Sequence, residues 1–258
     1  MKAALPAKPF SLLIWLALPA AALLALALDP PHALDAAIAR LFWAQGSFPM
    51  QHEASLLLIH RYAALVPGAI AILALARLVQ LRLSGADPAA RAESGRLAYL
   101  LLAMLSCVAT VWWLKSTTGV YCPWSIEGFG GTRPLSSPSL SLAFQSGKCW
   151  PGGFAGTGFC LFSLFFAFRD RHPVLARAGL ALALAFGGFC SAVQMIRGAH
   201  FLSHNAATLC IDWLICAFAY CALFARAEFA RRLVTAGAVL ALLLRRLGFS
   251  KVAHSKAG

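Results

Sequence analysis

Long apolar runs separated by short polar segments dominate the chain. Six runs come close to the length of about 20 residues that a helix needs to cross a bilayer. Only 12% of the 258 residues are charged and 60% are hydrophobic, which excludes an ordinary soluble domain. The pattern predicts an all-α integral membrane protein, a six-transmembrane-helix bundle. The runs cover residues 10–28, 62–81, 97–114, 152–168, 178–196 and 205–224.

Shorter apolar segments lie between and after these runs. Residues 36–43 and 55–60 are too short to cross and carry polar residues, so we expect amphipathic helices on the outer surface. Residues 233–244, between two arginine pairs, predict a similar helix on the inner surface. The expected organisation is an N-terminal transmembrane anchor (1–28), an outer interfacial segment (29–61), a helical core (62–225) whose outer loop is 115–151, and a basic cytoplasmic tail (226–258).

The basic residues predict the orientation. With six spans and a cytoplasmic N-terminus, 16 of the 22 Lys and Arg residues fall inside and 6 outside, as the positive-inside rule requires. This favours a bacterial inner-membrane protein with both termini cytoplasmic and the outer loop facing the periplasm. The net charge of +13 lies in short clusters, so it does not predict nucleic-acid binding. A cleaved signal peptide, with Lys2 and Lys8 before the first run, is the alternative.

Ionisable residues gather where the fifth run ends and the sixth begins. Arg197, His200 and His204 would be costly at the rim of a membrane bundle unless they face water or a polar ligand, so they predict an anion site. Lys115 ends the third run, directly after Trp112 and Trp113. A lysine there is either a snorkelling anchor or a phosphate ligand.

Pro151, Gly152 and Gly153 open the fourth run. Proline suits the first turn of a helix, and glycines there leave the first backbone amides bare, which suits an anion. Alternatively, the glycines only permit close packing between helices. Both interpretations stay open from the sequence.

Two of the eight cysteines, Cys122 and Cys149, fall in the outer loop. An extracytoplasmic compartment is oxidising, so we expect a disulfide between them. The other six lie in or near the runs and are expected to pack as small apolar side chains. Metal binding by the loop cysteines with His200 and His204 is an alternative, but no further ligand spacing supports it. We therefore predict no metal site.

The order of Lys115, the Pro-Gly-Gly opening and Gly198-Ala-His200-Phe-Leu-Ser resembles the membrane branch of the type 2 phosphatidic acid phosphatase superfamily, over residues 95–225. The resemblance implies a phosphatase-like core of six helices. It also implies that an outer-face site removes phosphate from a lipid phosphate or pyrophosphate, with no metal or other cofactor. One histidine becomes phosphorylated, a second protonates the leaving group, and an acid orients the first. The implied partners are the lipid substrate and membrane lipids.

Carried onto this chain, the resemblance makes His200 the nucleophile, because it follows Gly198 by two positions. His204 stands where the family has the orienting acid, and an imidazole four residues on shares a helix face with His200. Lys115 matches the lysine of the first motif. With the amides of Gly152 and Gly153, it is expected to bind phosphate.

Two arginines of the family pattern are replaced. Cys122-Pro123 stands where Arg-Pro is expected, and Arg133, later in the same loop, is the candidate replacement. Gln194 stands where the third motif has arginine. Arg197 lies one helical turn further on and is the candidate to clamp the phosphate instead.

Phe154 is the largest departure, since the family has its proton-donating histidine there. A positioned acid contributes about 10²- to 10⁴-fold to rate. A pyrophosphate suffers less from its loss than a monoester, because phosphate leaves more easily than an alkoxide. The sequence thus predicts a lipid phosphatase, with a catalytically impaired protein that binds anionic lipid head groups as the alternative. A channel or transporter is disfavoured because the runs contain few polar residues.

Overall fold

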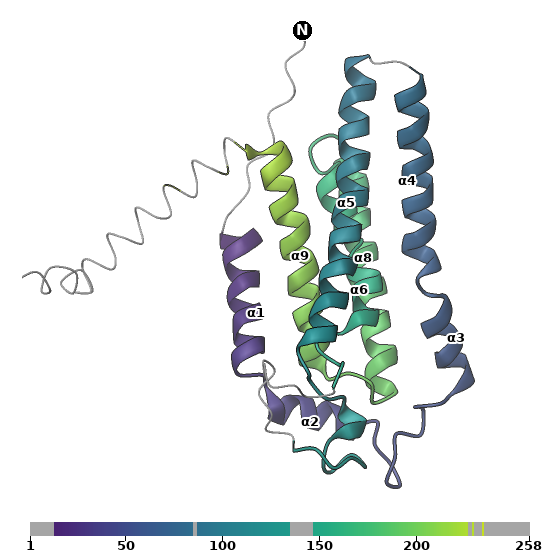
Figure 1. The fold of residues 1–258 in the computed structure, drawn as a ribbon, viewed down its shortest axis with the longest axis vertical. Helices are drawn as coiled ribbons and strands as arrows, with labels where there is room; N and C mark the ends of the chain where they lie inside the picture. The colour runs from purple at the N-terminus through teal and green to yellow at the C-terminus, as the bar shows by residue number, and fades with distance from the viewer. Residues whose placement is uncertain (1–12, 85–86, 135–146, 227–228, 230–233, 235–258) are drawn as a thin grey trace, which may run out of the picture. The chain divides into compact units, whose positions relative to one another are not determined.

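The computed structural model describes residues 13–84, 87–134, 147–226, 229 and 234. Within them the regular structure is helical and no β-strand occurs, which confirms the predicted all-α class. The elements are η1 (Leu13–Ala17), α1 (Leu18–Leu28), α2 (His32–Arg40), α3 (Ala54–Tyr62), α4 (Leu65–Leu83), α5 (Pro88–Thr117), η2 (Pro123–Ser125), α6 (Gly153–Phe159), α7 (Phe162–Phe168), α8 (Pro173–Ile196) and α9 (Leu202–Phe224) (Figure 1).

The chain forms two compact units, Met1–Ala219 and Tyr220–Gly258. The second unit begins with the last turn of α9, where the rings of Tyr220 and Phe224 pack at 5.6 Å between centroids. The predicted inner-surface helix at 233–244 lies outside the described residues, apart from residue 234.

Four described helical segments are long and apolar enough to span a membrane: Ala54–Leu83, Pro88–Thr117, Pro173–Ile196 and Leu202–Phe224. A fifth is possible if Ile14–Leu28 and His32–Arg40, bent by 79°, count as one span. The predicted six-span count is not confirmed. The fourth apolar run forms α6 and α7, two helices of 7 residues each. Together they reach about 24 Å, short of a hydrocarbon core of about 30 Å.

The outer segment departs in part from its predicted form. The helix expected over 36–43 corresponds to α2, which turns sharply away from α1. The segment expected as a separate interfacial helix at 55–60 is α3, and it continues into α4 as a single 30-residue apolar stretch. The two are joined by only two residues, so α3 is one end of a candidate span.

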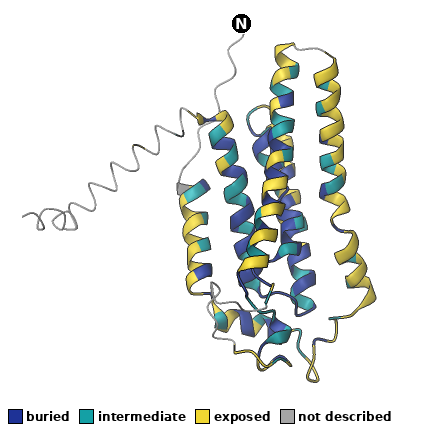
Figure 2. Ribbon diagram, in the orientation of Figure 1, coloured by how far each residue is buried: buried dark blue, intermediate teal, exposed yellow. Residues whose placement is uncertain are grey.

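Glycines set the closest helix contact in this unit, between α6 and α8. A Cβ at Gly158 would collide with the backbone of Gly187, and one at Gly187 would collide with the ring of Phe159. Small residues permit such approach in membranes, where packing drives association. Most of α6 is buried, whereas α4 exposes most of its leucine and isoleucine side chains (Figure 2). The outward side chains suit a lipid environment.

Several helix ends meet at one end of this unit. The C-termini of α5 and α8 lie there with the N-termini of α3, α6 and α9, and α2 runs across them (Figure 1). Trp112 and Trp113, near that end of α5, are 70% and 59% exposed. Exposed tryptophans near a span end are typical of a membrane interface. The predicted site residues belong to these helix ends.

Candidate active site

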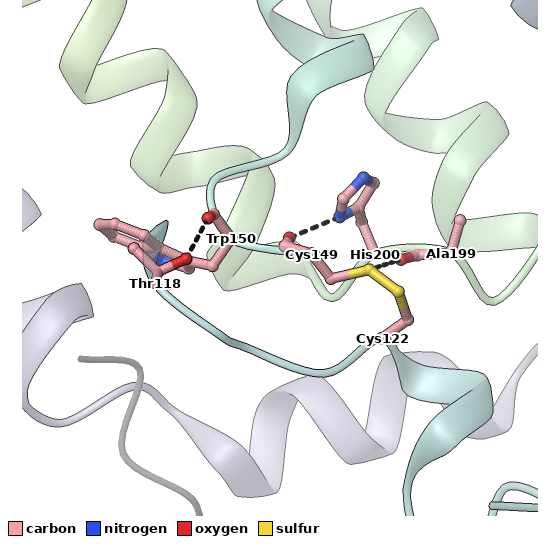
Figure 3. Close-up of a disulfide and its surroundings, with 6 residues drawn as sticks. All are labelled: Thr118, Cys122, Cys149, Trp150, Ala199 and His200. Atoms are coloured by element: carbon pink, nitrogen blue, oxygen red, sulfur yellow. Dashed lines mark hydrogen bonds between the residues drawn. A yellow bond between two sulfur atoms is a disulfide. The ribbon is translucent and has the colours of Figure 1, made fainter. Parts of the chain in front are cut away.

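His200 lies in the short connection between α8 and α9. The turn depends on Gly198, whose φ of +68° favours glycine, and a Cβ there would also collide with the ring of Phe48. The imidazole is 4% exposed, and its Nδ1 lies 2.8 Å from the carbonyl oxygen of Cys149 (Figure 3). A carbonyl only accepts hydrogen bonds, so Nδ1 carries the proton. The lone pair of the neutral ring is therefore on Nε2.

A disulfide fixes the segment that holds this carbonyl. Cys122 and Cys149, 27 residues apart, are joined with their Cα atoms 5.2 Å apart (Figure 3). The Cys149 amide donates to the Val120 carbonyl at 2.9 Å, and the Thr118 hydroxyl donates to the Trp150 carbonyl at 2.7 Å. The end of the outer loop is thus tied back to its beginning. The same disulfide uses both thiols that the alternative metal site would need as ligands.

The surroundings of His200 favour its neutral form. Burial lowers the pKa of His200 well below its usual range, and the positive charges of Lys115, His204 and His60 lower it further. The hydrogen bond to the Cys149 carbonyl only partly opposes this. At neutral pH the ring is therefore unprotonated on Nε2, which is the state a nucleophile requires.

Lys115, in the last turn of α5, lies against the start of α6. A Cβ at Gly153 would be 3.3 Å from Cδ of Lys115 and 3.7 Å from its Nζ. The missing side chain at position 153 thus makes room for the lysine. The structure brings Lys115 and Gly153 together as the sequence predicts for a phosphate site.

The expectation for Gly152 needs correction. Its amide donates to the carbonyl of His204 at 3.1 Å, so it is not free to bind phosphate. Its carbonyl accepts the hydroxyl of Thr208 at 3.1 Å, and a Cβ at this position would collide with the side chain of Asn205. Close packing of α6 on α9, the alternative interpretation, explains this glycine.

Arg197 ends α8 and is held in place on two sides. Its Nε donates to the backbone carbonyl of Gln51 at 3.2 Å, and Nη1 donates to Oε1 of Gln194 at 3.0 Å. Gln194, which stands at the position of the family arginine, thus helps to hold Arg197 in place, and the phosphate role of Arg197 stays a prediction. Burial lowers the pKa of Arg197. A guanidinium nevertheless keeps its charge at neutral pH.

His204 lies in the first turn of α9, beside His200. The two ring centroids are 5.9 Å apart with an angle of 74° between the planes. Nδ1 of His200 is bound to the Cys149 carbonyl, and Nδ1 of His204 has no hydrogen-bond partner within the described chain. A backbone carbonyl, not the imidazole, thus orients His200 through Nδ1. The catalytic role of His204 stays a prediction.

Arg133 is not brought to this cluster. Its backbone pairs with Ser125 and Glu127, which closes a turn on the loop surface. The exposed guanidinium lies 4.9 Å from the ring centroid of Tyr121. No contact among the described residues joins it to His200 or Lys115. The expected replacement of the first-motif arginine by Arg133 stays a prediction without support from these contacts.

Sequence reasoning missed two side chains at this end of the unit. Asp35 of α2 is 2% exposed and accepts the amide of Ser203 at 2.9 Å and its hydroxyl at 2.5 Å. This carboxylate caps the start of α9, beside His204. His60 of α3 packs on Phe154, with 4.6 Å between ring centroids. The only sequence signal for these two side chains was that ionisable residues occur in both short helices, α2 and α3.

Comparison with known proteins agrees with this arrangement. The sequence model of the PAP2 superfamily matches residues 96–228, a stretch that includes Lys115, Arg197, His200 and His204. Neither the curated proteins nor the solved structures gave a match. Membership suggests a phosphatase, and the apolar helices fit a membrane protein. Because the match covers more than half of its length, the chain belongs to the PAP2 superfamily.

Proposed function

We propose that this protein is a membrane-embedded phosphatase that hydrolyses a lipid phosphate or pyrophosphate at the outer face of the membrane. One observation carries the proposal: Nδ1 of His200 is bound to the Cys149 carbonyl, which leaves Nε2 of a buried neutral imidazole to attack phosphorus. Lys115 and Arg197, at the ends of α5 and α8, supply positive charge for the phosphoryl oxygens. This division of roles is that of a phosphohistidine mechanism.

The reaction has two steps. Nε2 of His200 forms a bond to phosphorus while the bond to the leaving-group oxygen breaks, and that oxygen keeps the electron pair and takes up a proton. Water then attacks the phosphohistidine, gives up its proton, and releases inorganic phosphate as the nitrogen recovers its lone pair. The Nδ1 hydrogen bond to Cys149 also stabilises the ring as it becomes positively charged.

A lipid substrate fits the location of the cluster. The site residues lie at the ends of apolar helices, near the exposed Trp112 and Trp113. A substrate with its tail in the bilayer would present its phosphate at that depth. The basic-residue distribution supports a location at the outer face of a bacterial inner membrane, with both termini in the cytoplasm.

Phe154 supports a second candidate, a protein that binds anionic lipid head groups with little turnover. This ring stands at the position of the family acid and donates no proton. The same feature favours a pyrophosphate substrate over a monoester if turnover occurs.

Phosphate release from purified protein in detergent tests the proposal. We expect release from an isoprenoid pyrophosphate and from phosphatidic acid, with His200→Ala abolishing both and His52→Ala leaving both unchanged. His52 is an exposed histidine outside the cluster. Brief reaction with substrate labelled in the transferred phosphate should leave acid-labile label on the His200 peptide. No release above His200→Ala would sink the enzyme, and binding to anionic vesicles would then favour the second candidate.

A further inference from the structure

The position that lacks a proton donor has a histidine packed on it from another helix. Phe154, at the start of α6, has the ring of His60 of α3 against it, with 4.6 Å between centroids and 51° between planes. The two residues are 94 positions apart, so no motif spacing connects them. Tertiary packing thus places the imidazole of His60 against the residue that stands at the family's acid position.

Apolar packing explains why α3 holds this place. Phe154, 8% exposed, forms a buried cluster with Ala63 at the end of α3 and with Val193 of α8. Leu56 and Ile59 pack against the same cluster. Leu56, His60 and Ala63 recur at helical spacing, so His60 shares the face that meets Phe154. A phenylalanine at 154 offers α3 an apolar platform that a histidine would not.

The charged side chains of the candidate active site also interact electrostatically with His60. Lys115 and Arg197 are close enough to interact with it electrostatically, and His60 in turn acts on His200. The side chain is exposed, and no hydrogen bond to its ring is found in the described part of the chain. His60 therefore lies within electrostatic range of Lys115, Arg197 and His200, and no hydrogen bond among the described residues holds its ring nitrogens.

We propose that His60 is the general acid of the reaction, in place of the histidine that Phe154 replaces; this rests on the proposed phosphatase function. As Nε2 of His200 bonds to phosphorus, the leaving-group oxygen takes the electron pair of the broken bond and a proton from the His60 imidazolium. His60 is then neutral. In the second step it takes a proton from the attacking water and returns to its starting state. Lys115 and Arg197 by themselves disfavour a protonated His60, so its protonation depends on the negative charge of the bound phosphate.

Leaving-group dependence tests this role, because an acid matters most when the leaving group is poor. In His60→Gln, kcat on an alkyl phosphate monoester such as phosphatidic acid should fall by about 10²- to 10⁴-fold. On a p-nitrophenyl ester, whose leaving group needs no proton, the loss should stay below about 10-fold. The alkaline limb of the monoester pH profile should also disappear. Equal losses on both substrates, or no loss on either, would overturn the proposal.

Two further variants distinguish a catalytic role of His60 from a purely structural one. Phe154→His in the His60→Gln background restores an acid at the family position and should recover monoester turnover at least about 10-fold. The single variant His52→Gln should behave as the unaltered protein. If the unaltered protein releases phosphate and His200→Ala does not, a neutral His60→Gln refutes this inference alone. If the unaltered protein releases none, the proposed function itself fails.

Discussion

At the residue scale, the chemistry depends on one imidazole whose two nitrogens have different tasks. Nδ1 of His200 donates to the Cys149 carbonyl, and Nε2 remains for phosphorus. The spacing from Gly198 is the basis for predicting that His200 is the nucleophile. It could not predict the orienting group, because a backbone carbonyl 51 residues away belongs to no motif and every residue has one.

Burial of a neutral His200 predicts a pH-dependent stability. Its folded pKa lies below the unfolded value of about 6.5, so the unfolded chain takes up a proton first as the pH falls. The contribution of His200 to the free energy of unfolding is fully present above about pH 6.5. Below that pH it decreases by up to about 1.4 kcal/mol per pH unit. Thermal unfolding in detergent between pH 8 and 5 should be less pH-dependent in His200→Gln than in His52→Gln. Equal slopes would contradict the buried neutral state.

At the element scale, two adjacent glycines of α8 differ in the space available for a side chain. A Cβ at Gly187 would collide with the ring of Phe159 of α6, whereas one at Gly188 has no neighbour within 4 Å. We expect Gly187→Ala to lower the free energy of unfolding by about 1–3 kcal/mol, since overpacking displaces α6. Gly188→Ala should be neutral or slightly stabilising because alanine favours helix. Thermal midpoints of the two variants would decide, and similar values would exclude the tight α6–α8 contact.

The disulfide also acts at this scale, because it ties the loop that holds the Cys149 carbonyl to the end of α5. Mass spectrometry of unreduced peptides should find Cys122 linked to Cys149, and both thiols free would contradict it. Reduction should lower phosphate release by about 10- to 100-fold, as expected when a nucleophile is displaced by about 1 Å. The double variant Cys122→Ser, Cys149→Ser should show the same loss and no further effect of reductant.

At the scale of the whole molecule, the orientation in the membrane remains a prediction from the basic residues. The native cysteines form a useful background, since six are buried and two are paired. Cysteines introduced at the exposed positions Gln45, beyond α2, and Ser84, after α4, therefore report the two sides. A membrane-impermeant maleimide should label Gln45→Cys on intact spheroplasts, and Ser84→Cys only after permeabilisation. The reverse result would put the site inside.

The sequence by itself determined the helical class, the long apolar segments and the histidine of the most specific motif. These depend on local periodicity and on short spacings, which the chain carries directly. The predicted count of six spans is not confirmed, because the run at α6 and α7 forms two helices of only 7 residues each. The amide of Gly152, expected from the sequence to be bare, has a partner on α9.

Tertiary structure alone decided the partners that come from distant segments. The guanidinium of Arg133 lies over Tyr121, and Arg197 is held by the carbonyl of Gln51. His60 lies against Phe154 only because the apolar face of α3 packs there. Such contacts depend on how helices pack in three dimensions, and burial, not spacing along the chain, fixes that. A residue lost from a motif is therefore visible in the sequence, but its replacement is visible only in the fold.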